Sequence, residues 1–153
     1  MAKEKTRGKH RKKRPRKPLP GMMLHLDGSS HPWLPDLPGQ MDDLLVLMDD
    51  ANNEIYEMKL VPEEDTLGCM ILLKDCIAKH GIFCSLYSDR ASHFFFTPKA
   101  GDKVLEGHLT QIGRALRDLG VKMIPSYSPQ ARGRSERMNE TLQGRIPNEL
   151  KLH

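Results

Sequence analysis

The sequence is poor in aromatic residues and contains no long apolar segment. Phe, Trp and Tyr make up 5% of the 153 residues, with a single Trp, whereas charged residues make up 29%. No run approaches the roughly 20 apolar residues of a transmembrane helix. The basic N-terminal residues are not followed by the apolar stretch of about 7–15 residues that a signal peptide carries. We therefore expect a soluble protein with one core of ordinary domain size and no membrane contact.

Cysteine is also scarce. The three residues, Cys69, Cys76 and Cys84, form an odd set without a C-x-x-C pair. This pattern predicts reduced thiols packed in the core of an intracellular protein. The seven histidines show no regular spacing for metal ligands, so the sequence predicts no structural zinc site.

Positive charge is concentrated at the N-terminus. Residues 1–20 contain ten Lys and Arg but one Glu, whereas the rest of the chain is mildly acidic, with 14 basic and 19 acidic residues. Such a segment cannot bury apolar surface and attracts polyanions. We expect residues 1–20 to form a basic disordered arm or linker, either simply solvated or in salt-dependent contact with phosphates. Residues 21–150 would form the folded domain.

Hydrophobic periodicity predicts an α/β fold with a mixed five-stranded sheet flanked by helices. The predicted strands occupy residues 22–27, 44–48, 55–60, 82–87 and 121–124, and the predicted helices occupy residues 63–80, 108–119 and 131–147. The first three strands follow one another directly, which is typical of an antiparallel meander. The fourth and fifth strands each follow a helix, so we expect them to be parallel to the first.

The single Trp, Trp33, lies in a loop rich in Pro and Gly at residues 28–40. We expect Trp33 to plug the edge of the core. The alternative is that its ring stacks on a nucleic-acid base.

Three acidic residues stand at comparable places in this pattern. Asp27 ends an apolar run and precedes Gly28, and Asp89 follows the fourth predicted strand. Glu136 lies on the last helix, beside an apolar stripe made of Ser135, Met138, Leu142 and Ile146. If the first and fourth strands are parallel neighbours, Asp27 and Asp89 emerge side by side and Glu136 can complete the group.

Carboxylates this close repel each other unless a cation lies between them. Oxygen ligands suit Mg²⁺, and two ions about 3.5–4 Å apart would support displacement at a phosphodiester. The alternative for each acid taken alone is an ordinary solvated side chain at a strand or helix end.

Three motifs carry a resemblance to a known family over residues 10–150. They are Leu26-Asp27-Gly28-Ser29 with His31 and Trp33, Tyr87-Ser88-Asp89-Arg90, and Ser-Pro-Gln-Ala-Arg-Gly-Arg-Ser-Glu-Arg at residues 128–137. The chain resembles the catalytic core of DDE-type transposases and retroviral integrases, which has an RNase H-like fold. It is most similar to the ISNCY group of bacterial insertion-sequence transposases.

The resemblance implies roles for individual residues. Asp27, Asp89 and Glu136 match the metal-binding catalytic triad, with Mg²⁺ or Mn²⁺ as cofactor and two ions expected. The implied activity is DNA strand nicking by water, followed by strand transfer from the freed 3′-hydroxyl. The residues expected to bind DNA are Arg132, Arg134, Arg137, Asn139 and Gln143. The arginines would meet backbone phosphates, and a solvated helix surface is the alternative for each.

The implied partners are transposon-end and target DNA and further copies of this chain in an oligomer on that DNA. The implied location is the bacterial cytoplasm, in association with the nucleoid. Family members normally also carry an N-terminal helix-turn-helix region and more chain after the catalytic helix. We therefore expect a fragment or decayed copy of a longer transposase. The alternatives are an RNase H-like nuclease that hydrolyses without joining and a non-catalytic DNA-binding remnant.

Overall fold

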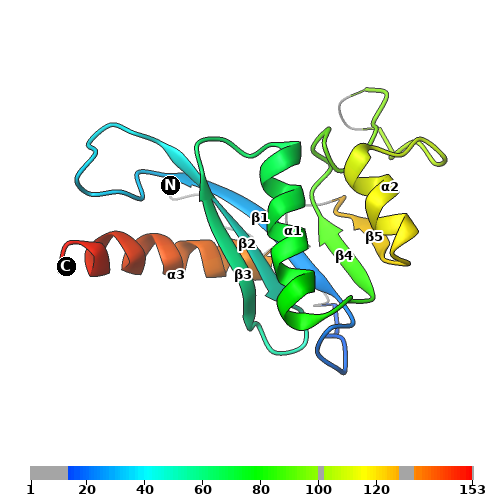
Figure 1. The fold of residues 1–153 in the computed structure, drawn as a ribbon, viewed down its shortest axis with the longest axis horizontal. Coiled ribbons are helices and arrows are strands. Elements are labelled where there is room, and N and C mark those ends of the chain that lie inside the picture. The colour runs from blue at the N-terminus through cyan, green and yellow to red at the C-terminus, as the bar shows by residue number, and fades with distance from the viewer. Residues whose placement is uncertain (1–13, 100–101, 128–132, 153) are drawn as a thin grey trace, which may run out of the picture.

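The computed structural model describes residues 14–99, 102–127 and 133–152. Within these ranges, five strands and three helices follow each other in sequence (Figure 1). In order they are β1 (Leu24–His31), β2 (Asp42–Asp49), β3 (Ile55–Val61), α1 (Thr66–His80), β4 (Ser85–Ser88), α2 (Gln111–Asp118), β5 (Lys122–Pro125) and α3 (Gly133–Leu150). No helix in these ranges is long and apolar enough to cross a membrane.

All five strands belong to one sheet with the order β3-β2-β1-β4-β5. The pairs β1–β2 and β2–β3 are antiparallel, whereas β1–β4 and β4–β5 are parallel. The predicted mixed sheet, with an antiparallel meander and two parallel strands beyond it, is confirmed. Because β1 lies at its centre, residues of β1 face neighbours on both sides.

Helices α1 and α2 cover one face of the sheet, and α3 crosses the other (Figure 1). The larger core lies on the side of α1 and α2, where Leu24, Leu45 and Leu86 of the sheet meet Leu72 and Ile112 of the helices. These side chains are almost completely excluded from solvent. Burial of this apolar surface fixes the two helices against the sheet.

A second, smaller cluster lies under α3. It consists of Trp33, Leu44, Val46 and Met48, packed against Ile55, Met138, Leu142 and Ile146. Trp33 is buried, and its indole N–H donates to the Ser29 carbonyl oxygen at 3.1 Å. This confirms its predicted place in the core and leaves no open ring face for stacking on a base.

The helix termini follow the local sequence. The Asp65 side chain accepts from the Gly68 N–H at 2.6 Å and caps α1, which ends at Gly81 with a positive φ of 84°. Helix α1 begins three residues later than expected, at Thr66. Helix α3 was expected to stop at Pro147 and instead continues to Leu150, where the Asn148 amide donates to the Gly144 carbonyl oxygen.

One expectation about exposure and one about helix length were wrong. Cys84 is exposed, whereas Cys69 and Cys76 are buried as predicted. Side chains alternate along an extended segment, so with Phe83 and Ser85 buried, Cys84 points outward. Helix α2 is shorter than predicted because Thr110 caps it by accepting from the Gly113 N–H.

Candidate active site

Asp27 lies within β1 rather than at its end. The expected break at Gly28 does not occur, because β1 pairs with β2 over all eight of its residues, up to His31. The side chain of Asp27 is buried, with 7% exposed, and borders a small space shared with His25 and Val46 under α3. The Asn139 amide of α3 donates to Asp27 Oδ2 at 2.9 Å. Asp27 is therefore a carboxylate held on the α3 face of the sheet.

Asp89 is the residue after β4. Pairing between β1 and β4 ends at His25 and Tyr87, so Asp27 and Asp89 each lie two residues past that last pair. Side chains two residues apart point to the same face, and neighbouring strands lie about 4.8 Å apart. Asp89 Oδ1 also accepts from the Ala91 N–H at 3.0 Å, which turns the chain away from the sheet. Asp27 and Asp89 thus occupy equivalent positions beyond the last β1–β4 pair.

Helix α3 runs parallel to β1. Asn139 donates to Asp27, and four residues later the Gln143 amide donates to Ser29 Oγ at 2.6 Å. Four helical residues span about 6 Å, and two strand residues span about 6.6 Å. The spacing of the contacts on the helix therefore matches the spacing on the strand. The two contacts together fix the position of α3 along β1.

Glu136 is exposed and lies in the first turn of α3. Its position is bracketed by contacts on both sides: Arg134 forms an ion pair with Asp50, and Asn139 bonds to Asp27. Residues three apart on a helix are neighbours on its surface, so Glu136 lies about one turn before Asn139, the residue that bonds to Asp27. Among the described residues, the ligand oxygens of the three acids do not all lie within 4.8 Å of each other. At least one pair of these ligand oxygens is therefore more than 4.8 Å apart.

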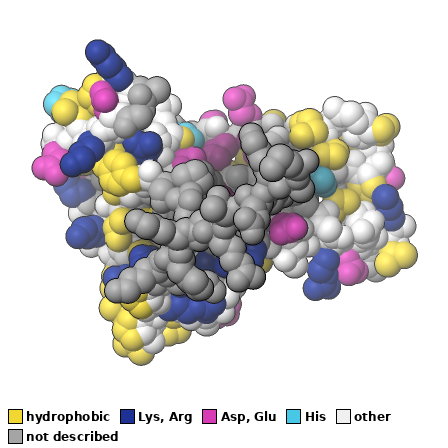
Figure 2. Space-filling model, turned by 180° about the vertical axis from the view of Figure 1, so that it is seen from behind, with side chains coloured by type: hydrophobic (Ala, Val, Ile, Leu, Met, Phe, Trp, Pro, Cys, Tyr) yellow, Lys and Arg dark blue, Asp and Glu magenta, His cyan; other side chains and the backbone are white. Residues whose placement is uncertain are grey.

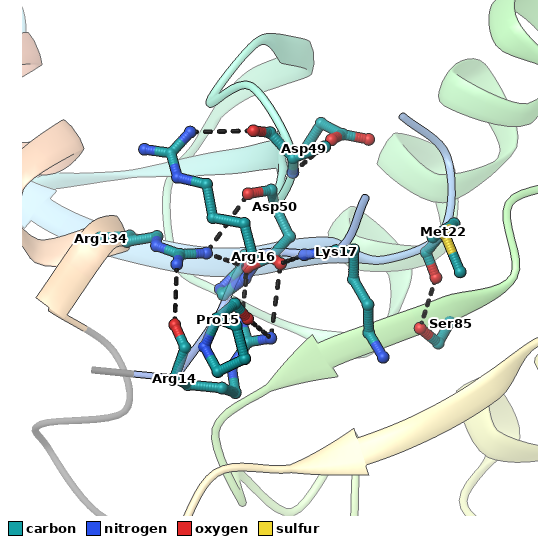
Figure 3. Close-up of polar contacts among 11 residues, drawn as sticks. Arg14, Pro15, Arg16, Lys17, Met22, Asp49, Asp50, Ser85 and Arg134 are labelled. Atoms are coloured by element: carbon teal, nitrogen blue, oxygen red, sulfur yellow. Dashed lines mark hydrogen bonds and ion pairs between the residues drawn. The ribbon is translucent and has the colours of Figure 1, made fainter. Parts of the chain in front are cut away.

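Asp50 at the end of β2 is a polar centre that the sequence did not reveal (Figure 3). It is fully buried and pairs with Arg14 and Arg134, accepts from the Lys17 N–H at 2.7 Å, and accepts from His25 Nε2 at 2.8 Å. Burial raises the pKa of the Asp50 carboxyl, but the hydrogen bonds from Arg14, Lys17 and His25 outweigh it and lower the pKa to about 2. Asp50 is therefore ionised and binds the first turn of α3 to the sheet.

His25 lies between this centre and β4. Burial lowers its pKa, so the ring is neutral at pH 7 and carries its proton on Nε2, toward Asp50. Its ring centroid lies 4.9 Å from that of Tyr87. Asp50 is not among the residues singled out from the sequence. The available signal was its place directly after an apolar strand, which is the pattern that identified Asp27.

The residues expected to bind DNA have different environments. Arg132 lies outside the described residues. Arg134 is 22% exposed and bound to Asp50, whereas Arg137 is exposed and its Nε donates to the Gly133 carbonyl oxygen of its own helix. The amides of Asn139 and Gln143 are directed at β1. Figure 2 shows several exposed Lys and Arg side chains on one face of the molecule.

The fold matches that of retroviral integrase cores. An intasome of simian T-cell lymphotropic virus, in complex with the PP2A regulatory subunit B56 gamma, aligns with 88% of this chain and 44% of that chain, at 18% identity and a TM-score of 0.62. The magnesium complex of the HTLV-2 integrase catalytic core domain, in its dimeric form, aligns with 80% of this chain and 67% of that chain, at 15% identity and a TM-score of 0.57. The chain has the RNase H-like fold of the integrase catalytic core, as predicted.

Two bacterial transposases are similar in sequence. The "Putative transposase y4bF" of Sinorhizobium fredii (strain NBRC 101917 / NGR234) is 37% identical over 132 residues, which are 86% of this chain. The transposase for insertion sequence IS1202 of Streptococcus pneumoniae is 32% identical over 143 residues, or 92% of this chain. The chain spans 28% and 30% of the lengths of these relatives. No protein-family model matches it. The chain is thus a homologue of part of these transposases.

Proposed function

We propose that this chain is the catalytic core of a DDE-type transposase that nicks DNA and transfers the cut strand, with Asp27, Asp89 and Glu136 as its catalytic acids. The observation that carries the proposal is that Asp27 and Asp89 each lie two residues beyond the last β1–β4 pair, with Asn139 of α3 bonded to Asp27. The two transposase relatives and the integrase fold support the same chemistry.

The donor set of the site fits a hard divalent cation. All three side chains offer carboxylate oxygens, which suit Mg²⁺ or Mn²⁺, and the HTLV-2 core is described in complex with magnesium. Two carboxylates brought close together repel each other, and a cation between them removes that repulsion. When bound, two such ions would supply activation of the attacking oxygen and stabilisation of the leaving oxygen.

The remaining residues position the acids and the substrate. The Asn139 amide orients Asp27, since it donates to one carboxylate oxygen and is itself buried. Arg134, through Asp50, holds the turn of α3 that carries Glu136. Arg137 is the exposed guanidinium beside this turn, and we assign it a contact with backbone phosphate, which positions DNA without selecting a base sequence. Arg132 and Gln143 complete the proposed DNA-binding set.

The finer assignments belong to the same proposal. We place the chain in the ISNCY group, with residues 1–20 as a basic linker and residues 21–150 as the catalytic core of a longer transposase. Its partners would be transposon ends, target DNA and further copies of the chain in the bacterial cytoplasm. Two competing functions are hydrolysis without joining and DNA binding without catalysis.

The test compares three variants with a matched control. Asp27→Asn, Asp89→Asn and Glu136→Gln are each expected to reduce Mg²⁺-dependent or Mn²⁺-dependent nicking of supercoiled plasmid to background, with an unchanged urea unfolding midpoint. Glu140→Gln, an exposed acid on the same helix, is expected to retain activity. Nicking by any of the three variants at the wild-type rate would refute the assignment.

Two further measurements separate the competing functions. Joined strands among the products distinguish transfer from hydrolysis alone. Calorimetric titration with Mg²⁺ is expected to show binding that is weakened in the three variants. A wild-type chain that binds DNA but not Mg²⁺, and nicks nothing, would be a non-catalytic remnant.

A further inference from the structure

A second group of potential metal ligands lies on the other side of the sheet from α3. The ligand atoms of Glu64, Cys69 and His93 all lie within 4.8 Å of one another. Glu64 of this group lies beside Gly28 of β1, since a Cβ built on Gly28 would be 2.0 Å from Glu64 Oε2. The group comprises one carboxylate, one thiol and one imidazole, and none of the three was assigned to the DNA-cutting site.

Separate elements hold the three side chains. Glu64 precedes the cap of α1, and its own N–H donates to Asp43 Oδ2 at 2.7 Å. Cys69 lies in the first turns of α1 and is fully buried. His93 belongs to the turn after Asp89, and its Nε2 lies 2.9 Å from Glu64 Oε1. The Glu64 and His93 side chains remain 21% and 13% exposed, which gives an ion access from solvent.

The local charge favours a cation. Glu64, Asp65 and Asp89 place negative charge around the buried Cys69 side chain. These charges attract a divalent cation to this place. Binding would then displace the thiol proton, as at other cysteine-containing metal sites.

We propose that Glu64, Cys69 and His93 form a Zn²⁺-binding site, with water as the fourth ligand. Thiolate and imidazole ligands suit zinc, whereas Mg²⁺ prefers oxygen ligands. In tetrahedral zinc sites the ligand atoms lie about 3.4–3.6 Å apart, given Zn–S near 2.3 Å and Zn–N or Zn–O near 2.1 Å. The spacing of at most 4.8 Å exceeds what zinc requires by no more than about 1.4 Å, which side-chain rotations can supply.

Spacing along the chain could not reveal this group. Its members come from the segment before α1, from α1 itself and from the turn after β4, and only the fold brings them together. A zinc ion here would connect α1 with the turn that follows Asp89. Because it binds the folded chain, it would also raise the stability of the protein.

The test uses Co²⁺ as a spectroscopic probe and Zn²⁺ itself in the full chain. We expect one equivalent of Co²⁺ to produce a thiolate-to-cobalt charge-transfer band in the near ultraviolet, and Zn²⁺ to remove the band by displacement. A tenfold excess of Mg²⁺ should leave it unchanged. Zn²⁺ is also expected to raise the unfolding temperature of the wild-type protein.

Variants assign the ligands. Cys69→Ser should abolish the band, whereas Cys76→Ser, which changes a second buried thiol on the same helix, and Cys84→Ser, which removes the exposed thiol, should retain it. Glu64→Gln and His93→Gln replace partly exposed ligands and should lower Zn²⁺ affinity at least tenfold even if Cys69→Ser fails to fold. A wild-type chain without the band, a band lost only in Cys84→Ser, or unchanged affinity in Glu64→Gln and His93→Gln would overturn the proposal. None of these readouts depends on DNA cleavage.

Discussion

Replacing Asp50 by Asn is expected to destabilise the protein by about 2 kcal/mol at neutral pH, because the change removes the charge on which two guanidinium groups converge. Asp50 is fully buried and pairs with Arg14 and Arg134 while accepting from His25 and from the Lys17 N–H. Asn has nearly the same shape and keeps one acceptor oxygen. The variant therefore tests the charge rather than the packing.

The magnitude follows from the pKa of the carboxyl. A decrease from 3.8 to about 2 corresponds to roughly 2 kcal/mol, at about 1.4 kcal/mol for each pH unit. Removing one partner of a fully buried pair costs about 3–5 kcal/mol. Here Arg14 is 43% and Arg134 22% exposed, and water can solvate them after the change. We therefore expect the smaller value.

The pH dependence has a definite sign. Because folding lowers the pKa of Asp50, its ionised form stabilises the folded state above about pH 3.8, and this contribution disappears as the pH falls toward 2. The unfolding free energies of the wild type and Asp50→Asn, measured in urea between pH 7 and pH 2, should differ by about 2 kcal/mol at pH 7 and converge near pH 2.

The control is Asp118→Asn, since Asp118 is exposed and pairs only with its exposed neighbour Arg117 among the contacts described. A surface change of this kind should alter the unfolding free energy by less than about 0.5 kcal/mol. The reasoning would be refuted if Asp50→Asn unfolded at the wild-type urea concentration, or if its deficit were equally large at pH 2 and pH 7.

Two further changes test the close contacts of β1. Asn139→Asp replaces the amide that bonds to Asp27 with a second carboxylate and should cost about 1–3 kcal/mol at pH 7, with much of the loss recovered at pH 4 as one acid is protonated. An equal loss after the exposed change Asn148→Asp in urea unfolding would argue against that contact. Gly28→Ala would place a Cβ 2.0 Å from Glu64 Oε2 and 3.3 Å from Leu45 Cδ2. We expect thermal unfolding to show a loss of about 1–3 kcal/mol, whereas Gly144→Ala, with nothing within 4 Å, should be neutral or stabilising by up to about 1 kcal/mol.

The sheet and the order of its strands could be predicted because apolar periodicity records which faces are buried. The apolar run at Leu44–Met48 and the helices before the fourth and fifth strands were enough to predict a meander with two further strands parallel to its first, and in the structure β1 lies at the centre. That placement in turn brought Asp27 and Asp89 to one edge. The end of β1 could not be predicted, because its pairing with β2 continues through Gly28 to His31, and no local signal records a partner strand.

The polar contacts of the site were not predictable for a related reason. Asp50 meets Arg14 and Arg134, which are 36 and 84 positions away in the sequence. A hydrogen bond between distant residues leaves no periodic trace, whereas an apolar face does. The same limit applies to Glu64, Cys69 and His93, each of which looks like an isolated polar or core residue in the sequence.

These polar contacts have a specific task in placing Glu136. The apolar stripe of α3, at Ser135, Met138, Leu142 and Ile146, repeats every three or four residues, and apolar contact is non-directional. A slip of one helical turn would therefore keep an apolar side chain over the sheet while moving Glu136 by about 5.4 Å. It would also break the bonds that Arg134, Asn139 and Gln143 make with Asp50, Asp27 and Ser29. Because hydrogen bonds weaken steeply away from their preferred geometry, these contacts select one position of the helix along β1. Apolar packing thus decides which face of α3 meets the sheet, and the polar contacts decide where Glu136 lies along it.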